Sequence, residues 1–298
     1  NMLSILIPTY NYSVVELVTI VHKQALMAAI PFEIIVIDDC STNQDINDKN
    51  KIIEDLVFCT YLKNEKNLGR TATRNSLAIK ATYDLLLFLD ADVLPKHDDF
   101  INKFELNINK KFKVIYGGIC YYKEKPKPDQ LLRWNYGHKR ETKSVSNRVG
   151  EPYFIISQNL LINKKVFIKN NTLGKNTYGL DILFSGNLLK NDVKVKHIDN
   201  PVYHLGLENN ETFLNKSLEA VKTTYLLDKN NQINKDLRPL QKSYLFLNKW
   251  KVDGIYCAVF KLIKKAIKSN LLSNNPSMFM FDLYRLNYFI ELKNKRHG

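Results

Sequence analysis

Short apolar runs alternate with amphipathic segments over the first ninety residues of the chain. The runs are rich in Ile, Leu and Val, and they predict strands at residues 3–7, 32–37, 60–62 and 83–89. The segments between them carry apolar residues at helical spacing and predict helices at residues 14–29, 51–58 and 71–81. Strands that are apolar along their whole length and alternate with helices belong to parallel sheets covered on both faces. The sequence therefore predicts an α/β fold with a mostly parallel sheet.

Polar side chains stand directly after three of these strands. They are Thr9, Tyr10 and Asn11 after the first strand, Asp38 and Asp39 after the second, and Asp90 and Asp92 after the fourth. Open parallel sheets bind ligands beyond the carboxyl ends of their strands. We therefore expect a ligand site at this edge of the sheet.

Asp90 and Asp92 form a D-x-D pattern at the end of the strand predicted at residues 83–89. Two carboxylates one residue apart can share a divalent cation and the phosphates that it holds, and hard oxygen ligands suit Mg²⁺ or Mn²⁺. The pattern alone also fits a turn or a helix N-cap, because Asp favours both. Its position after a fully apolar strand favours the functional interpretation.

A basic segment begins the helix predicted at residues 71–81. Its pattern is formed by Asn67, Gly69, Arg70 and Arg74. A glycine at a helix start with cations nearby suits the binding of anions, although the same arginines would also suit a solvated helix face.

In the Asp38–Asp39 pair, one carboxylate can cap the following turn, and the other can accept hydrogen bonds from a nucleobase or a ribose.

The mixed pattern continues as far as residue 227. Helices are predicted at residues 100–109, 181–190 and 211–227, and strands at residues 113–122 and 193–198. Residues 141–150 are polar and without periodicity, and we expect this segment to be mobile.

Four segments, in this order and spacing, resemble the family 2 glycosyltransferases, which have the GT-A fold. They are residues 5–11 (ILIPTYN), 33–42 (EIIVIDDCST), 67–75 (NLGRTATRN) and 88–92 (FLDAD). The resemblance covers residues 2–100 and continues more weakly to about residue 215. It implies a GT-A domain over residues 1–230, with a Rossmann-like sheet and helices on both faces, followed by a basic helical region over residues 231–298.

The resemblance also implies an activity and a donor site. The enzyme would move a sugar from a nucleotide-diphosphate donor, a UDP-sugar by preference, to a hydroxyl of a saccharide or lipid-linked acceptor, with inversion, in the synthesis of cell-surface polysaccharide or lipooligosaccharide. The donor-binding residues that it implies are Pro8, Thr9, Tyr10, Asn11, Asp39, Asn67, Arg70, Arg74, Asp90 and Ala91. A Mn²⁺ or Mg²⁺ ion would be held by Asp90, Asp92 and His204, with Asp92 in direct contact and Asp90 reaching the ribose or a metal-bound water.

The catalytic base that the resemblance implies is Asp181. The family usually has an acidic pair before a helix in its second half, and here Leu180 stands in place of the first acid. Asp181 could also serve as the N-cap of the following helix. Weaker likenesses place Ser157 and Asn159 under the sugar and diphosphate. Trp134 lies in an amphiphilic stretch and could stack on an acceptor sugar or belong to the core.

The net charge of +14 suggests a polyanionic partner, and more than half of it lies near the end of the sequence. Residues 240–298 contain eleven Lys or Arg and three Asp or Glu. Residues 255–268 carry Lys261, Lys264, Lys265 and Lys268 at helical spacing and predict a basic amphipathic helix. One interpretation packs its apolar face on the catalytic domain, and the other places the helix on an anionic membrane, where lipid-linked acceptors reside.

Further features bear on the compartment. No apolar run approaches the roughly 20 residues of a membrane span, and residues 2–8 predict a strand rather than a signal peptide because no basic region precedes them. The cysteines Cys40, Cys59, Cys120 and Cys257 form no C-x-x-C pair, so we expect free thiols. We therefore expect a cytoplasmic protein, with peripheral contact to the cytoplasmic face of the inner membrane as the second interpretation of the basic helix.

Two other functions fit parts of the pattern. A nucleotidyltransferase could use the same nucleotide pocket, but its chemistry favours a Gly-rich phosphate loop with a Lys near the N-terminus, and residues 8–11 offer neither. A non-catalytic nucleotide- or nucleic-acid-binding protein is suggested by charge alone, and that charge is concentrated away from the acidic strand ends. The sequence favours glycosyl transfer and predicts no nucleic-acid partner.

Overall fold

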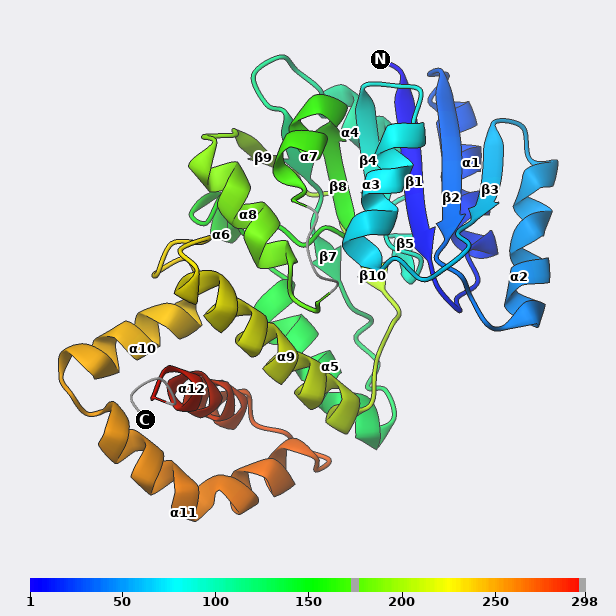
Figure 1. Cartoon of the computed structure of the whole chain (residues 1–298). Coiled ribbons are helices and arrows are strands. Elements are labelled where there is room, and N and C mark those ends of the chain that lie inside the picture. The colour runs from blue at the N-terminus through cyan, green and yellow to red at the C-terminus, as the bar shows by residue number, and fades with distance from the viewer. Residues whose placement is uncertain (173–176, 295–298) are drawn as a thin grey trace. The chain divides into compact units, whose positions relative to one another are not determined.

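The computed structural model describes residues 1–172 and 177–294, which belong to two compact units (Figure 1). The first unit consists of Asn1–Tyr121, Glu141–Asn176 and Asn187–Gly206, and the second of Tyr122–Arg140, Thr177–Gly186 and Leu207–Gly298. The boundary predicted at residue 230, between a GT-A domain and a basic helical region, stays a prediction.

The first unit is built on a seven-stranded sheet with the order β3-β2-β1-β4-β8-β6-β9. Its strands are β1 (Leu3–Thr9), β2 (Phe32–Asp38), β3 (Cys59–Lys63), β4 (Leu85–Leu89), β6 (Val114–Tyr116), β8 (Asn159–Asn163) and β9 (Val195–His197). All neighbours are parallel except β8, which runs antiparallel to β4 and β6. The predicted α/β fold with a mostly parallel sheet is confirmed.

Helices flank this sheet, and the first of them buries the apolar face that its spacing predicts. They are α1 (Val15–Met27), α2 (Gln44–Lys51), α3 (Arg70–Lys80), α4 (Phe100–Asn107), α6 (Val145–Val149) and α7 (Lys164–Asn170). In α1, Leu17, Val18 and Val21 are buried in one core cluster with Ile5 and Ile7 of β1. The apolar strands and helix faces therefore share a core, as close-packed layers require.

The helix predicted at residues 51–58 is wrong, because the helical segment lies earlier in the chain. It is α2, followed by a short 3₁₀ turn at Ile52–Asp55. The Asn43 side chain accepts a hydrogen bond from the Ile46 amide at 3.2 Å, which caps the start of α2. The buried residues of α2 are Asn47 and Asn50. Because this inner face is polar, α2 has no apolar periodicity.

The single strand predicted at residues 113–122 is also wrong, because two glycines divide it. β6 ends at Tyr116, and after Gly117 and Gly118 the chain joins a second sheet as β7 (Ile119–Cys120). Gly118 has a φ of 97°, which favours glycine. A Cβ on Gly117 would lie 2.4 Å from the Asn159 amide nitrogen. The second sheet has the order β5 (Val93–Pro95), β10 (Val202–His204) and β7.

The segment at residues 141–150, expected to be mobile, is instead held by a buried arginine. It contains α6, and the Arg148 side chain is almost completely buried. Arg148 donates hydrogen bonds to the carbonyls of Tyr116 at 3.2 Å and of Ile198 at 2.9 Å. Burial lowers the pKa of Arg148 from its usual value. Residues 141–150 are therefore held in place by Arg148, although their sequence is polar and without periodicity.

The second unit is helical. It contains α5 (Leu131–Tyr136), α9 (Asn210–Lys229), α10 (Pro239–Lys249), α11 (Asp253–Leu271) and α12 (Met278–Asn294), together with the first residues of α8 (Asp181–Lys190). Short helical turns cover Pro128–Gln130 and Gly137–Glu141. One of its core clusters joins Phe213 of α9, Phe260 of α11 and Phe281 of α12. No helix of the described residues is long and apolar enough to cross a membrane.

The four cysteines of the chain, Cys40, Cys59, Cys120 and Cys257, are free thiols, as predicted.

Candidate functional site

The predicted ligand edge of the sheet exists in the first unit. β2, β1 and β4 are neighbours in the sheet and run in the same direction, so Thr9, Asp39 and Asp90 follow strand ends at one edge. Thr9 and Asp39 are joined directly, since the Asp39 amide donates to the Thr9 carbonyl at 2.8 Å. The sequence pattern therefore predicted correctly that these residues share one edge, and the binding of a ligand there stays a prediction.

Asn11 and the loop after β2 shape one side of this edge. Asn11 has a φ of 50°, a left-handed conformation that Asn tolerates better than most residues. Its side-chain oxygen accepts hydrogen bonds from the amides of Thr42 at 2.9 Å and Asn43 at 3.0 Å. Tyr10, the preceding residue, is half exposed. Asn11 thus holds the two strand-end loops together, and Tyr10 offers an accessible aromatic face.

Asp39 organises the loop that leads into α3. Its carboxylate accepts hydrogen bonds at 2.8 Å from the Asn64 side chain and from the amides of Leu68 and Gly69. The Asn67 side chain donates to the Asp39 carbonyl at 3.1 Å. A carboxylate can accept about four hydrogen bonds, so room for one ligand donor is left. The prediction that Asp39 binds a nucleobase stays a prediction, whereas its support of the loop is observed.

Asp90 lies between the two predicted arginines. Arg70 donates to one oxygen of the Asp90 carboxylate, and Arg74 donates to the other. Arg74 is buried and also donates to the Ser157 hydroxyl and, at 2.8 Å, to the Ser157 carbonyl. The Arg70 side chain is 41% exposed, so this cation reaches solvent while Arg74 does not. Asp90 therefore positions two cations at the strand end, and its role as a metal ligand stays a prediction.

Asp92 lies next to His204, which comes from a strand more than a hundred residues later. The distance from Asp92 Oδ2 to His204 Nε2 is 3.1 Å. β10 pairs with β5 so that His204 stands opposite Val93, directly after Asp92. Two of the three predicted metal ligands are therefore brought together by the second sheet.

A chain of hydrogen bonds holds the His204 ring on the side of Nδ1, away from Asp92. The other ring nitrogen, Nδ1, lies 3.1 Å from the Tyr121 hydroxyl, and this hydroxyl donates to the Glu141 carboxylate. Since the hydroxyl proton points to Glu141, its oxygen is placed to accept the proton of His204 Nδ1. A proton on Nδ1 would allow Nε2 to bind a cation in place of the hydrogen bond that it makes to Asp92. The sequence analysis missed Tyr121 and Glu141.

The absence of a side chain at Gly206 makes room for the Asp92 carboxylate beside His204. A Cβ on Gly206 would lie 2.0 Å from Asp92 Oδ2 and 3.2 Å from His204 Nε2. Any side chain would therefore displace one of the two potential ligands. The sequence analysis also missed Gly206, although its position two residues after His204 is a signal that could have directed attention to it.

The electrostatic environment keeps Asp92 ionised. Burial raises the pKa of Asp92, but the hydrogen bond from His204 and the charges of His204 and Arg70 outweigh burial, so that the pKa lies below its usual value. The nearby carboxylate in turn contributes to a raised pKa of the Tyr12 hydroxyl, for which burial is the larger cause. A carboxylate that stays charged is a suitable ligand for a hard cation.

The donor set fits a divalent cation that is shared with a phosphate ligand. Among the described residues, no cluster of three or more His, Cys, Asp or Glu side chains is placed to hold a metal ion. Asp92 and His204 offer one carboxylate oxygen and one imidazole nitrogen, which lie 3.1 Å apart. Mg²⁺ and similar ions are commonly bound by one or two side chains together with substrate phosphates.

The remaining predicted residues have other local roles. Asn159 is buried and donates at 2.8 Å to the carbonyls of Gly118 and Asn200, so it holds the glycine turn between the two sheets. In the second unit, the Trp134 indole donates to the Tyr122 carbonyl at 3.0 Å, and its ring packs on His138 at a centroid distance of 4.3 Å. Asp181 is the first residue of α8 and is partly exposed. Roles in sugar or acceptor binding and in proton transfer stay predictions for these residues.

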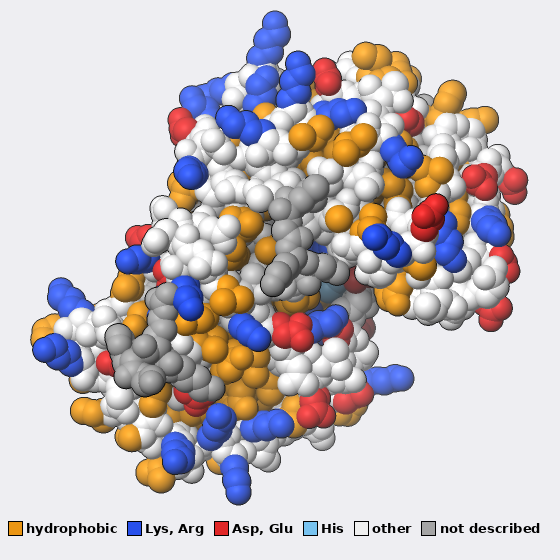
Figure 2. Space-filling view, in the orientation of Figure 1, with side chains coloured by type: hydrophobic (Ala, Val, Ile, Leu, Met, Phe, Trp, Pro, Cys, Tyr) orange, Lys and Arg blue, Asp and Glu red, His pale blue; other side chains and the backbone are white. Residues whose placement is uncertain are grey.

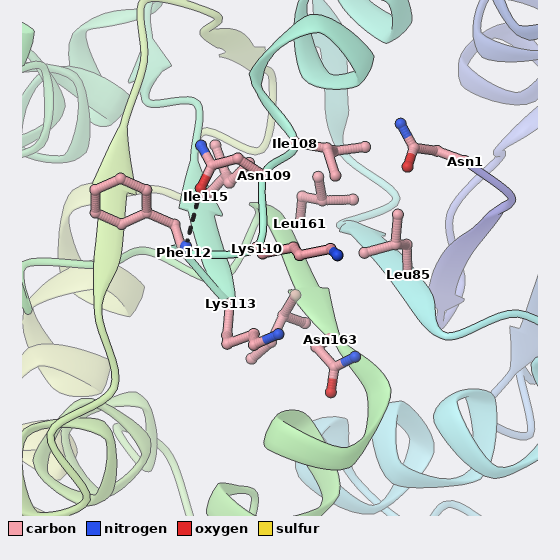
Figure 3. Close-up of a pocket in the computed structure, with 11 residues that line it drawn as sticks. Asn1, Leu85, Ile108, Asn109, Lys110, Phe112, Lys113, Ile115, Leu161 and Asn163 are labelled. Atoms are coloured by element: carbon pink, nitrogen blue, oxygen red, sulfur yellow. Dashed lines mark hydrogen bonds between the residues drawn. The ribbon is translucent and has the colours of Figure 1, made fainter.

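A separate pocket of about 350 Å³ lies at the opposite edge of the sheet (Figure 3). It is next to Leu85 at the amino end of β4 and Asn163 at the carboxyl end of the antiparallel β8. Lys110 and Lys113 lie among the aliphatic side chains that line it. Because Asp90 follows the other end of β4, this pocket is not part of the candidate site.

Comparison with known proteins identifies the family. The sequence model of glycosyl transferase family 2 matches residues 4–170, which is more than half of the chain. The chain belongs to glycosyl transferase family 2. This family 2 protein is also 26% identical over 181 residues to an uncharacterized glycosyltransferase of Haemophilus influenzae, a match that covers 56% of the chain and 55% of the relative. The chain thus spans about half the length of this relative.

Solved structures of other proteins have a similar fold. The mannosyltransferase PcManGT of Pyrobaculum calidifontis, in complex with GDP-Man and Mn²⁺, has a TM-score of 0.61 and 14% identity, with 99% of this chain and 86% of that chain covered. Residues 1–349 of S. aureus TarS give a TM-score of 0.51 and 16% identity, with 100% and 91% covered. At these identities the likeness establishes the fold alone. The GT-A fold predicted for the family 2 protein is therefore confirmed.

Proposed function

We propose that this protein is a metal-dependent, inverting glycosyltransferase that takes a sugar from a nucleoside-diphosphate donor. The observation that carries the proposal is the group formed by Asp92, His204 and Gly206 at the strand edge, beside the Asp90–Arg70–Arg74 ion pairs. A carboxylate and an imidazole that lie side by side suit a cation, and cations suit a diphosphate. Family membership supports the same activity.

The donor is a nucleoside diphosphate sugar, with a UDP-sugar as our preferred assignment. Two structural neighbours support this class, since one is in complex with GDP-Man and Mn²⁺ and TarS 1–349 is in complex with UDP-GlcNAc. In this chain, Tyr10 and Asn11 would line the nucleoside pocket, and Arg70 would meet the phosphates. Arg70 suits this role because its guanidinium is partly exposed while Asp90 holds it in place.

The reaction follows from charge and proton transfer. When bound, Mn²⁺ or Mg²⁺ would neutralise the negative charge that develops on the leaving diphosphate. Arg70 would stabilise the same charge from a second direction. Asp181 would accept the proton of the acceptor hydroxyl while that oxygen attacks the anomeric carbon. One such displacement inverts the anomeric centre.

The acceptor class is a saccharide or a lipid-linked saccharide, in the synthesis of cell-surface polysaccharide or lipooligosaccharide. Trp134 supports a sugar-binding role, because the edge of its indole is tied to Tyr122 while the ring stays partly accessible. Ser157 supports the donor side through its contact with Arg74.

A donor panel tests the proposal. The purified protein would be incubated with GDP-mannose and with UDP-linked glucose, galactose and N-acetylglucosamine, each with Mn²⁺, Mg²⁺ or EDTA. Release of nucleoside diphosphate would be measured together with the melting temperature. We expect one donor to be hydrolysed or to raise the melting temperature, and EDTA to abolish the effect. The absence of turnover and of stabilisation with every donor would contradict the proposal.

Metal binding should depend on the nucleotide. Because Asp92 and His204 supply only two ligands, the free protein should bind Mn²⁺ weakly, and UDP should increase its affinity by about tenfold or more. Mn²⁺ titrations followed by electron paramagnetic resonance, with and without UDP or GDP, measure this coupling. Equal Mn²⁺ affinity in the presence and absence of either nucleotide would argue against a shared site.

The Tyr121 hydroxyl should increase the affinity of the site for Mn²⁺. Tyr121→Phe removes the acceptor of His204 Nδ1, so the Mn²⁺ affinity of the nucleotide complex should fall about tenfold. The matched control is Tyr116→Phe, since that buried ring contacts His197 and Arg148 instead. The same Mn²⁺ titration separates the two variants. Unchanged affinity in Tyr121→Phe would show that the tyrosine only fills space.

A further inference from the structure

The helix α11 has two apolar faces, and only one of them is used in the core. Phe260, Ile267 and Leu271 are buried against α9 and α12. Ile255, Val259 and Leu262 are 65%, 54% and 85% exposed. The apolar residues of α11 are therefore divided between the core and the solvent.

The exposed apolar residues form a continuous stripe. Ile255, Val259, Leu262 and the exposed Ala266 are spaced by four, three and four residues, which places them on the same side of a helix. Two further exposed apolar residues lie at the end of the preceding helix, where Phe246 and the C-cap residue Trp250 are both 64% exposed and four positions apart. We call these six residues the α10–α11 apolar surface.

Lysines border this surface. α10, α11 and their connection carry seven lysines and a single acid, Asp253. Lys261 and Lys265 are exposed, lie one turn apart on α11 and make no ion pair among the described residues. In this part of the second unit, hydrophobic and basic side chains lie next to one another on the surface (Figure 2), and α12 lies on the inner side of α10 and α11 (Figure 1).

We infer that the α10–α11 apolar surface binds an anionic lipid bilayer from one side. A stripe of aliphatic and aromatic residues with lysines alongside is the pattern of an interfacial helix, whose apolar side chains enter the headgroup region while the lysines meet lipid phosphates. Trp and Phe favour this interfacial depth. Since no helix of the described residues could cross a membrane, the contact is peripheral.

Charge excludes the main competing occupants. A second copy of this chain on the same surface would bring the lysines of both copies together, which opposes association. Nucleic acid would meet the lysines but would leave Leu262 and its aliphatic neighbours uncovered by any complementary group. An anionic bilayer satisfies both the charge and the apolar area. A protein held there would meet lipid-linked acceptors at high local concentration.

Vesicle flotation tests the inference without donor or metal, so it is independent of the proposed chemistry. The probes are vesicles of phosphatidylcholine alone and of phosphatidylcholine with 30 mol% phosphatidylglycerol. We expect the full chain to bind only the anionic vesicles. Val259→Ser/Leu262→Ser should reduce the partition coefficient about 30-fold or more, and Lys261→Gln/Lys265→Gln should reduce it about tenfold or more.

The matched control is Ile79→Ser/Leu106→Ser, which removes two equally exposed apolar side chains from α3 and α4 of the first unit. This control should bind like the wild type. Because all substituted side chains are exposed, melting temperatures should stay close to that of the wild type. Absence of wild-type binding to anionic vesicles, or equal binding by the Val259→Ser/Leu262→Ser variant, would overturn the inference. A concentration-dependent dimer lost in that variant, without vesicle binding, would assign the surface to a second copy instead.

Discussion

Replacing Gly206 with alanine should reduce kcat/KM for the donor by about 100-fold or more, with the overall fold retained. The new Cβ would overlap Asp92 Oδ2 at 2.0 Å and would lie 3.2 Å from His204 Nε2. Asp92 cannot stay in place, and a displacement of about 1 Å of a group that positions reactants costs about two orders of magnitude in rate. Turnover of the nucleotide sugar and Mn²⁺ affinity in the presence of UDP measure the effect.

The control for this prediction is Gly150→Ala in the same unit. A Cβ on Gly150 would meet its nearest neighbour, the Asn147 carbonyl, at an ordinary contact distance of 3.8 Å. This variant should keep wild-type activity, and circular dichroism should show that both variants are folded. Wild-type turnover in Gly206→Ala would mean that the position of the Asp92 carboxylate is not needed for the reaction.

The two acids of the D-x-D pattern should separate into a structural and a chemical role. Asp90→Asn should lower the free energy of unfolding by about 3 kcal/mol, because it leaves the buried cation of Arg74 without its carboxylate. The side chains of Asp90 and Arg74 are only 12% and 5% exposed, so water cannot replace the lost partner. Urea unfolding measures this loss.

Asp92→Asn should reduce activity strongly and stability only slightly. The Asp92 side chain is more accessible, and its loss should cost only about 1 kcal/mol of stability, while activity should fall about 100-fold because the charged ligand is gone. Asp84→Asn, at an exposed position before β4, is the control and should change neither quantity. Equal stability losses in Asp90→Asn and Asp92→Asn would contradict this division of roles.

The fold and the location of the site could be predicted because both depend on local patterns. Runs such as residues 34–37 are apolar at every position, which is the pattern of a strand buried on both faces. Once the sheet is parallel, Thr9, Asp39 and Asp90 must follow strand ends at one edge. α2 could not be located in this way, because its buried side chains, Asn47 and Asn50, are polar and its start depends on the cap at Asn43.

The basic helix shows a second limit of periodicity. The spacing of residues 255–268 predicted an amphipathic helix, and α11 is that helix. Periodicity states that apolar residues share faces, but it does not state which face finds a partner. Packing of Phe260 and Ile267 with α9 and α12 decided that question and left Leu262 in solvent.

By itself, the sequence determined the mostly parallel sheet and the edge at which Asp90, Asp92, Arg70 and Arg74 lie, because each of these residues lies beside a strand or helix that its own neighbours specify. Only the tertiary structure decided how these residues are paired. Arg74 reaches Ser157 across 83 positions, and Asp92 reaches His204 across 112. The pairing of β10 with β5 and β7 places His204 between Asp92 and Tyr121 and brings Gly206 beside them. Such contacts join segments that are far apart in the chain, so no local pattern of residues contains them.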